Sequence, residues 1–342
     1  MADSPTPKPK RATSAEAPGA GSARAACRAA LDAWVRRSAD DSRAAPTTVA
    51  VACSGGADSL ALLQTAAERW PGAVVALHVH HGLQAAADAF EAHVRGAASR
   101  WELPVRVAHV SARPAPGESP EDAARRARYR ALAGLAPTGA VVLLGHHAAD
   151  QSETVLLALS RGAGLPGLAA MPVGFERHGV RFARPWLGLD PAVTRAALRE
   201  AGESWIDDPS NADPRFTRNR LRQHVLPGWR EAFPGADAAL ARTAAHAAQA
   251  QRLLDALARE DLARTGSPPA IAALQTLDRD RQANALRHWL RTVHGVAPSA
   301  AQLDELLDQV AACRTRGHRL HLRVAAGHVV RDGERLSYTP SV

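Results

Sequence analysis

Lysine is nearly absent from this chain of 342 residues: Lys8 and Lys10 are its only two, and both lie in the first ten positions. Almost all of the positive charge is therefore arginine. A Walker-A phosphate loop, a protein kinase and a Schiff-base enzyme each need a lysine inside the fold. The sequence therefore argues against these three classes, unless the N-terminal segment folds back into a site.

Cysteines and long apolar runs are also scarce. Cys27, Cys53 and Cys313 lie far apart, so they form neither the paired spacing of a zinc or iron–sulfur site nor an even disulfide framework. No apolar run approaches the roughly 18 residues of a membrane span, and the N-terminus lacks the apolar stretch of a signal peptide. We therefore expect a cytoplasmic protein in a reducing compartment.

Composition and charge favour a folded protein with a polyanionic partner. Apolar residues make up 46% of the chain and charged residues 22%, which are ordinary globular values. Lysine and arginine number 42 against 34 acidic residues, giving a net charge of +8. Such a balance favours nucleic acid as the partner. At about 150 residues per domain, the length predicts two domains.

Four short apolar runs predict buried parallel strands, and helical segments rich in Ala, Leu and Arg separate them. The strands are expected at 48–53, 73–79, 105–110 and 140–145, and the helices near 58–70, 86–101, 119–134 and 149–160. This alternation predicts an α/β fold with a doubly wound, mostly parallel sheet. Ligands of such sheets bind at the carboxyl ends of the strands. After Pro185 the pattern loosens through 190–202 and an Arg/Asn/Asp-rich loop.

The predicted domain organisation has three parts. Residues 1–24 are rich in Pro, Ala, Gly and Ser without apolar periodicity, which predicts a disordered basic tail. The α/β domain is assigned to 25–230 and a smaller α+β accessory domain to 231–342. In the latter, helices are expected at 236–263 and 280–312, and Asp332-Gly333 predicts a hairpin turn within an alternating C-terminal segment.

The segment Ser54-Gly55-Gly56-Ala57-Asp58-Ser59 directly follows the first predicted strand and precedes an apolar helix. Two glycines allow a sharp turn with inward N–H groups, the helix N-terminus adds partial positive charge, and the serines offer hydroxyls, so the segment predicts a phosphate-binding loop. A carboxylate beside phosphates requires a cation between them, so Asp58 suggests Mg²⁺. The alternative is a Ser/Gly turn with Asp58 as an ordinary helix cap.

This loop resembles the SGGxDS loop of the N-type ATP pyrophosphatases, the PP-loop superfamily, whose members adenylate a substrate and release pyrophosphate. Later segments narrow the resemblance to the tRNA(Ile)-lysidine synthases. In order, they are His78–Leu83, the ExxARxxRY helix at Glu121–Tyr129, the GHHxDDxxET segment at Gly145–Thr154, Arg161–Leu165 with Gly167 and Leu168, and the DPSN and RNxxR elements at Asp208–Asn211 and Arg218–Arg222. The resemblance covers residues 47–230 densely, and the C-terminal third matches only in type, as an accessory domain expected to contact tRNA.

The resemblance implies a Rossmann-like PP-loop fold and a two-step ligase reaction. With ATP and Mg²⁺, such an enzyme adenylates the C2 oxygen of the wobble cytidine in the CAU anticodon of tRNA(Ile) and releases pyrophosphate. The ε-amine of free L-lysine then attacks and AMP departs, which changes codon reading from AUG to AUA. Two other functions stay open: a catalytically silent tRNA-binding homologue, and a tRNA cytidine thiolase, which generally uses paired cysteines or a cluster.

Four residues are predicted to carry the chemistry: Asp58, Arg125, His146 and Asp150. Arg125 stands at the AR position of the family's helix, where its planar guanidinium is expected to bind ATP phosphates or the activated intermediate. The alternative is a solvated helix face on which Arg125 pairs with Glu121. His146 is expected to contact the phosphates or the attacked base.

The sequence departs from the family's pattern at Ala149, where many relatives carry the first Asp of a DD pair. We interpret Asp150 as sufficient, because helical spacing places it on one face with His146 and Glu153. Asp58 and Asp150 each lie just beyond a predicted strand end and are predicted to share the metal ion. Glu153 is the candidate acid for the α-ammonium of the lysine substrate.

An arginine cluster follows at Arg215, Arg218, Arg220 and Arg222, with His224 and the aromatic Phe216 and Trp205 nearby. Arginines that neutralise phosphates beside an aromatic that stacks a base suit RNA, so Arg218, Arg220 and Arg222 are predicted to bind the tRNA. Two alternatives stay open. The arginines pair with Asp207, Asp208 and Asp213, or Arg218 or Arg222 holds the DPSN loop.

Overall fold

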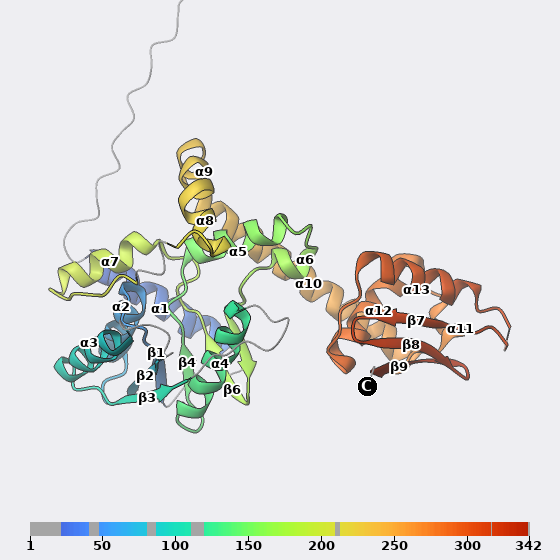
Figure 1. Ribbon diagram of the computed structural model, residues 1–342, viewed down its shortest axis with the longest axis horizontal. Coiled ribbons are helices and arrows are strands. Elements are labelled where there is room, and N and C mark those ends of the chain that lie inside the picture. Colours follow the sequence, from blue (N-terminus) through green and yellow to red (C-terminus); the bar gives the residue numbers. More distant parts are fainter. Residues whose placement is uncertain are drawn as a thin grey trace, which may run out of the picture. The chain divides into compact units, whose positions relative to one another are not determined.

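The computed structural model (Figure 1) describes residues 22–40, 48–80, 87–110, 120–208, 213–315 and 317–340. The chain separates into two compact units: one contains the chain up to Gly162 and Ala170–Arg242, the other Ala163–Ala169 and the chain from Thr243 onward. The division thus falls within helix α10 (Ala236–Thr265), beyond the boundary near residue 230 that the sequence suggested. Of the predicted N-terminal tail, only 22–24 lie within the described residues, and they begin helix α1 (Ser22–Asp40).

The first unit contains a six-stranded sheet of order β3-β2-β1-β4-β6-β5, in which only β5 runs antiparallel to its neighbour. The strands are β1 (Val49–Ala52), β2 (Val74–His80), β3 (Val105–His109), β4 (Val141–Leu143), β5 (Gly174–Arg177) and β6 (Val180–Ala183). The four predicted strands and the doubly wound topology are confirmed. Burial is confirmed for β1, β2 and β4 but not for β3, which lies at the edge of the sheet and has no buried residue. The β5–β6 hairpin was missed, because two half-buried strands of four residues each leave a weak apolar pattern.

Helices cover both faces of this sheet, because alternate residues of each strand point to opposite sides. On one face Val49 and Val51 join a core with residues of α1, α2 (Ala57–Arg69), α3 (Ala87–Arg100) and α7 (Pro191–Glu200). On the other face Ala50 and Ala52 pack with Tyr129 and Leu132 of α4 (Pro120–Leu135). Helix α5 (Ala148–Leu159) follows β4.

Two segments expected to be loose are helical. The first is α7, which the sequence signals through Asp190, whose carboxylate caps the helix by accepting from the backbone N–H of Ala192, and through Pro191 at the first helical position. The second is the Arg/Asn/Asp-rich stretch. It forms α8 (Thr217–Arg220), a π-helical turn η2 (Leu221–Val225) and α9 (Leu226–Ala232).

The second unit packs helices on a small antiparallel sheet of order β7-β8-β9. Its elements include α6 (Leu165–Leu168), α11 (Ile271–Leu274), α12 (Arg279–His294), α13 (Ala300–Ala312), β7 (His321–Val324), β8 (Gly327–Asp332) and β9 (Arg335–Pro340). The predicted helix 280–312 is two helices, because α12 ends at left-handed Gly295 and Ser299 caps α13. The hairpin turn is present, with Gly333 at φ 59° between paired Asp332 and Arg335. Within the described part of the chain, no helix is both long and apolar enough to cross a membrane.

Candidate active site

A cavity of about 700 Å³ lies in the first unit beyond the carboxyl ends of β1, β2 and β4. Between β1 and β4 the strand order changes direction, and open α/β sheets bind ligands at this switch point. The volume lies in the range of small-molecule sites. The residues that line the cavity include Ser54, Asp58, His80, Phe90, Arg128, His146, His147, Ala149, Asp150, Glu153, Arg195, Asp208, Arg222 and Arg230.

The loop Ser54–Ser59 forms one wall of this cavity and leads into α2. Gly55 has a φ of +92°, and a Cβ there would lie 3.2 Å from the ring of Phe90. The hydroxyl of Ser59 donates to the carbonyl of Gly56 at 2.9 Å and accepts from the N–H of Ser54 at 3.1 Å. Ser59 therefore braces the turn from inside, whereas Ser54 is exposed.

The loop after β4 approaches this turn backbone to backbone. A Cβ on Gly145 would lie 3.0 Å from the carbonyl oxygen of Asp58, so the position has no room for a larger residue without a shift. Helix α5 begins at Ala148 with His147 as its N-cap. His146 therefore precedes the helix, and only Asp150 and Glu153 of the predicted face belong to α5. Asp150 closes the helix end, since its Oδ2 accepts from the N–H of His147 at 3.0 Å.

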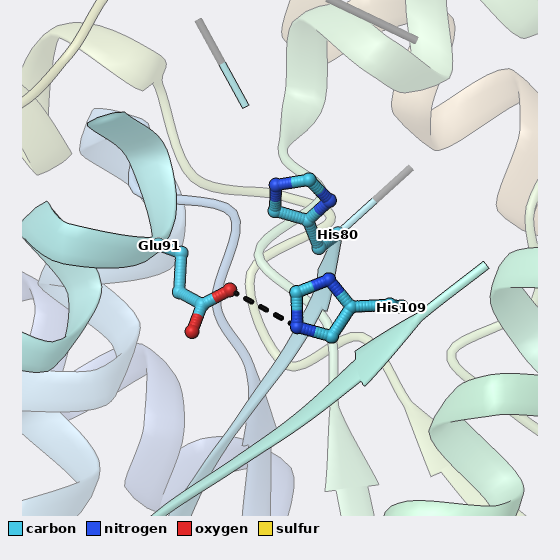
Figure 2. A group of neighbouring side chains, drawn as sticks. All are labelled: His80, Glu91 and His109. Atoms are coloured by element: carbon cyan, nitrogen blue, oxygen red, sulfur yellow. Dashed lines mark ion pairs between the residues drawn. The ribbon is translucent and has the colours of Figure 1, made fainter. Parts of the chain in front are cut away.

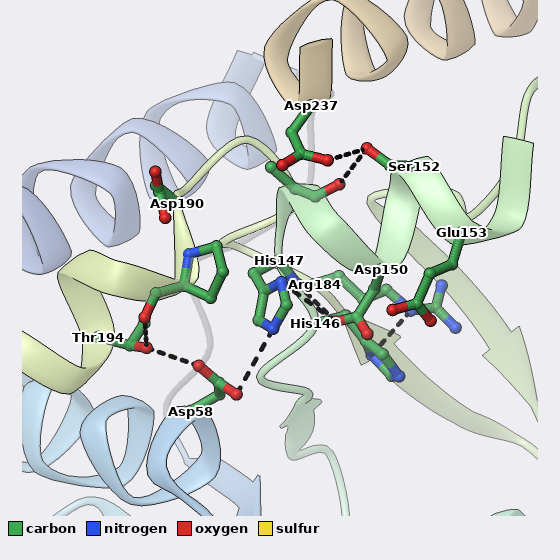
Figure 3. A network of polar contacts seen from close by, with 12 residues as sticks. Asp58, His146, His147, Asp150, Ser152, Glu153, Arg184, Asp190, Thr194 and Asp237 are labelled. Carbon is green, nitrogen blue, oxygen red and sulfur yellow. Dashed lines mark hydrogen bonds and ion pairs between the residues drawn. The ribbon is translucent and has the colours of Figure 1, made fainter. Parts of the chain in front are cut away.

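His147 stands between the two predicted metal-binding carboxylates (Figure 3). Its Nε2 lies 3.5 Å from Oδ2 of Asp58, and its Nδ1 lies 3.6 Å from Oδ2 of Asp150. Burial disfavours the charged imidazolium, yet the two carboxylates outweigh this and raise the pKa of His147. Burial likewise opposes ionisation of Asp58, but His147 and Thr194 together hold the pKa of Asp58 below its ordinary value.

Sequence reasoning missed two residues of α7 at this site. The hydroxyl of Thr194 donates to Oδ1 of Asp58 at 2.5 Å, and Arg195 lines the cavity. Thr194 is fully buried, so the contact fixes the Asp58 carboxylate from the side of α7. The N-cap and the proline at 190 and 191 are the signal that would have found this helix.

His146 contacts a third residue that sequence reasoning missed, Arg184, which is only 2% exposed. Arg184 donates from Nε to Nδ1 of His146 at 3.3 Å, from Nη2 to the hydroxyl of Tyr129 at 3.1 Å, and from Nη1 to the carbonyl of Pro172 at 2.8 Å. Burial and then the charge of Arg184 hold the pKa of His146 well below its usual range. His146 is therefore a neutral side chain at neutral pH.

The two arginines of the ExxARxxRY helix differ in position. Arg125 is exposed, and its guanidinium lies over the ring of Tyr129 at 5.4 Å from the centroid. Arg128, one turn further along α4, lines the cavity. The structure therefore brings Arg128, rather than the predicted Arg125, to the wall of the pocket.

The arginine cluster divides in the same way. Arg222 points into the cavity and forms a bidentate pair with the buried Glu153, with Nη2 3.0 Å from Oε2, and the same Nη2 lies 3.4 Å from Oδ1 of Asp150. Arg215 pairs with Asp213 at 2.7 Å, as the alternative reading proposed. Arg220 is exposed and donates to Thr217 and to the carbonyl of Pro214.

Arg218 is half-buried on α8, and its charge acts on both His146 and Glu153. Asp208 lines the cavity, and residues 209–211 of the DPSN element lie outside the described residues. The pairing of Arg222 with Glu153 and Asp150 differs from the predicted partners in the Asp207, Asp208 and Asp213 group.

The glycine turn after β1, the parallel sheet and the cavity at its switch point define a PP-loop protein. Residues 32–229 match the family model described as the PP-loop domain, and residues 270–337 match the TilS substrate binding domain. A tRNA(Ile)-lysidine synthase of Polaromonas naphthalenivorans is 58% identical over 84% of this chain and 88% of its own length. One of Bordetella bronchiseptica is 45% identical over the same shares. The chain belongs to the tRNA(Ile)-lysidine synthase family, as its motifs predicted.

The fold is also found in a solved structure with little sequence similarity. A U34-tRNA thiolase of Methanococcus maripaludis superposes with a TM-score of 0.55 at 13% identity, over 66% of this chain and 79% of that one. At this identity the likeness concerns the fold alone. It agrees with the doubly wound α/β architecture that the order of strands and helices predicted.

Proposed function

We propose that this protein joins L-lysine to C2 of the wobble cytidine of tRNA(Ile) with a CAU anticodon, using ATP. Family membership supports the reaction, and one observation in the structure carries it: a glycine loop at the switch point and two acidic side chains, Asp58 of the loop itself and Asp150, line one cavity. Backbone N–H groups at a helix N-terminus bind phosphate, and the acids are suited to the metal that accompanies it.

In the first step the C2 oxygen of cytidine bonds to the α-phosphorus of ATP, and the bond to the β-phosphate bridging oxygen breaks. We assign phosphate binding to the loop Ser54–Ser59 and the start of α2, with Arg128 as the nearby cation. Asp58 and Asp150 are the carboxylates that would hold Mg²⁺, which supplies neutralisation of the phosphate charge. Their oxygen donors are the type that Mg²⁺ prefers, and both line the cavity.

In the second step the ε-amine of lysine bonds to C2, the C2–O bond breaks, AMP leaves, and the amine loses a proton. We assign the α-carboxylate of lysine to Arg222 and its α-ammonium to Glu153, because this acid and base stand together in the cavity wall. His146 accepts from Arg184 through Nδ1, so its Nε2 carries the hydrogen and donates to a phosphate or to the base. Arg125 remains a predicted contact of the phosphates, and Arg218 and Arg220 remain predicted contacts of the tRNA.

The burial and protonation of the cysteines argue against a thiolase activity. The three are free and buried, and burial raises the pKa of the Cys53 thiol to about 11. Cys53 is therefore protonated at neutral pH, whereas sulfur transfer needs a thiolate.

The test is ATP–pyrophosphate exchange in the presence of tRNA(Ile) with a CAU anticodon, followed by nucleoside analysis after labelled lysine is added. The wild type should catalyse exchange and form lysidine. Asp58→Ala should lose exchange while remaining folded, because glycines and Ser59 set the loop. Asp122→Ala, an exposed acid on α4, is the matched control. Wild-type exchange in Asp58→Ala would refute the assignment of this residue, and absence of exchange in the wild type would favour a silent homologue.

A further inference from the structure

Two histidines and a glutamate gather at the end of the β2–β3 pair (Figure 2). His80 also lines the cavity described above, whereas Glu91 and His109 lie outside its lining. His80 and His109 are register partners in the parallel pairing of these strands, and Glu91 comes from α3. One ligand atom from each of the three lies within 4.8 Å of the other two. The imidazole centroids of His80 and His109 are 4.6 Å apart.

The glutamate is oriented for this cluster by a neighbour on its own helix. Arg95 donates to Oε1 of Glu91 from Nε at 2.9 Å and lies 2.8 Å away through Nη2. Oε2 faces the ring of His109, with Nε2 3.5 Å away. Burial opposes the charge, but Arg95 outweighs it and holds the pKa of Glu91 below its ordinary value, so the carboxylate is ionised at neutral pH.

His80 is oriented in a similar way. Its Nε2 lies 2.9 Å from Oδ1 of Asp88, which sits one turn before Glu91 on α3. Carboxylates that contact a histidine ring fix its orientation in metal sites. The first turns of α3 therefore bring one carboxylate to each histidine.

We propose that His80, Glu91 and His109 bind a divalent transition metal of the Zn²⁺ class. Two imidazoles and one carboxylate are the ligands of three-residue zinc sites, which keep a fourth position for water. Imidazole ligands favour such ions over Mg²⁺, so this site differs in chemistry from the one assigned to Asp58 and Asp150. Bonds of about 2.1 Å in a tetrahedron place ligand atoms about 3.4 Å apart, a contraction of about 1.4 Å at most.

The contraction is available because the His109 side chain is 66% exposed and that of Glu91 is 18% exposed, so neither is locked in a packed core. Metal binding would join α3 to the ends of β2 and β3. Phe90, the neighbour of Glu91, packs at Gly55 of the phosphate loop, so the ion would order the helix that supports this loop.

The test titrates chelator-treated protein with Co²⁺ and follows visible absorption, which is much stronger for tetrahedral than for octahedral Co²⁺. Zn²⁺ then competes the signal away. We expect one equivalent bound, and at least tenfold weaker binding in His109→Ala and in Glu91→Gln. His93→Ala is the matched control, because His93 lies on α3 with Glu91 but contacts the carbonyl of Ser204. It should bind Co²⁺ as the wild type does.

A second measurement guards against unfolded variants. Zn²⁺ should raise the melting temperature of the wild type and of His93→Ala, but not that of the two ligand variants, whose melting temperatures in chelator should equal that of the wild type. Unchanged Co²⁺ affinity in folded His109→Ala and Glu91→Gln, equal loss in His93→Ala, or the absence of a tetrahedral signal in the wild type would each overturn the proposal.

Discussion

Arg222 and Glu153 form a bidentate ion pair between residues 69 positions apart, with Nη2 of Arg222 3.0 Å from Oε2 of Glu153. Glu153 is only 1% exposed, whereas the arginine side chain keeps 37% of its exposure. The ion pair links η2, which carries Arg222, to helix α5, which carries Glu153 and Asp150. It therefore connects the arginine cluster to the cavity.

Removing Arg222 should destabilise the fold. In Arg222→Ala the buried Glu153 carboxylate loses its partner, and loss of one member of a fully buried pair costs about 3–5 kcal/mol. Because solvent reaches this arginine, we expect a loss of about 2 kcal/mol in the free energy of unfolding, measured with urea. Arg220→Ala, the exposed control, should stay within about 0.5 kcal/mol. Equal stability of the two variants would contradict the structural role of the pair.

Asp150→Asn should abolish ATP–pyrophosphate exchange, whereas Ala149→Asp should change it little. Asparagine still accepts the N–H of His147, so the cap of α5 survives and the free energy of unfolding should fall by less than about 1 kcal/mol. Exchange should be lost because asparagine lacks the negative charge of the Asp150 carboxylate, which is assigned to hold Mg²⁺ beside the phosphates. A large gain of exchange in Ala149→Asp would show instead that the native site is impaired by the missing acid.

The exposed arginines should govern the salt dependence of tRNA binding. Arg220→Ala should weaken tRNA binding. It should also make the negative slope of log affinity against log salt shallower by about 0.7–0.9. Affinity for ATP should barely change, because Arg220 lies outside the lining of the cavity. For Arg218→Ala, tRNA affinity at several salt concentrations and a melting curve are measured together. The two measurements distinguish an arginine that contacts RNA from one that stabilises the fold. A lower melting temperature with an unchanged slope would assign that arginine to the fold.

His146 should make stability fall in mild acid. Burial and Arg184 hold its folded pKa below the unfolded value of about 6.5, so the unfolded chain binds the proton more readily. The free energy of unfolding should therefore decrease as pH drops below about 6.5, by up to about 1.4 kcal/mol per pH unit. Urea unfolding at pH 7.5, 6.5 and 5.5 measures this slope. His146→Gln should flatten it, and an identical slope in that variant would contradict the assignment.

Elements with a strong local pattern were predictable from the sequence. The strands β1 to β4 are short apolar runs, and α2 follows two glycines, so neighbouring residues alone encode them. Helix α7 was missed because its apolar face, with Ala197 and Leu198, is short. The hairpin β5–β6 was missed because two strands of only four residues each, neither of them fully buried, leave a weak apolar pattern.

The sequence by itself determined which residues stand at the strand ends, because chain direction puts Asp58 and Asp150 just beyond parallel strands. It did not determine which side chains meet there. The contacts of Asp58 with Thr194 and of Arg184 with His146 join residues 136 and 38 positions apart. Such pairs depend on how the helices pack on the sheet. They also depend on which polar groups become buried and therefore need a partner in place of water. Only the tertiary structure therefore decided that His147 lies between the two acids and that Arg222 neutralises Glu153.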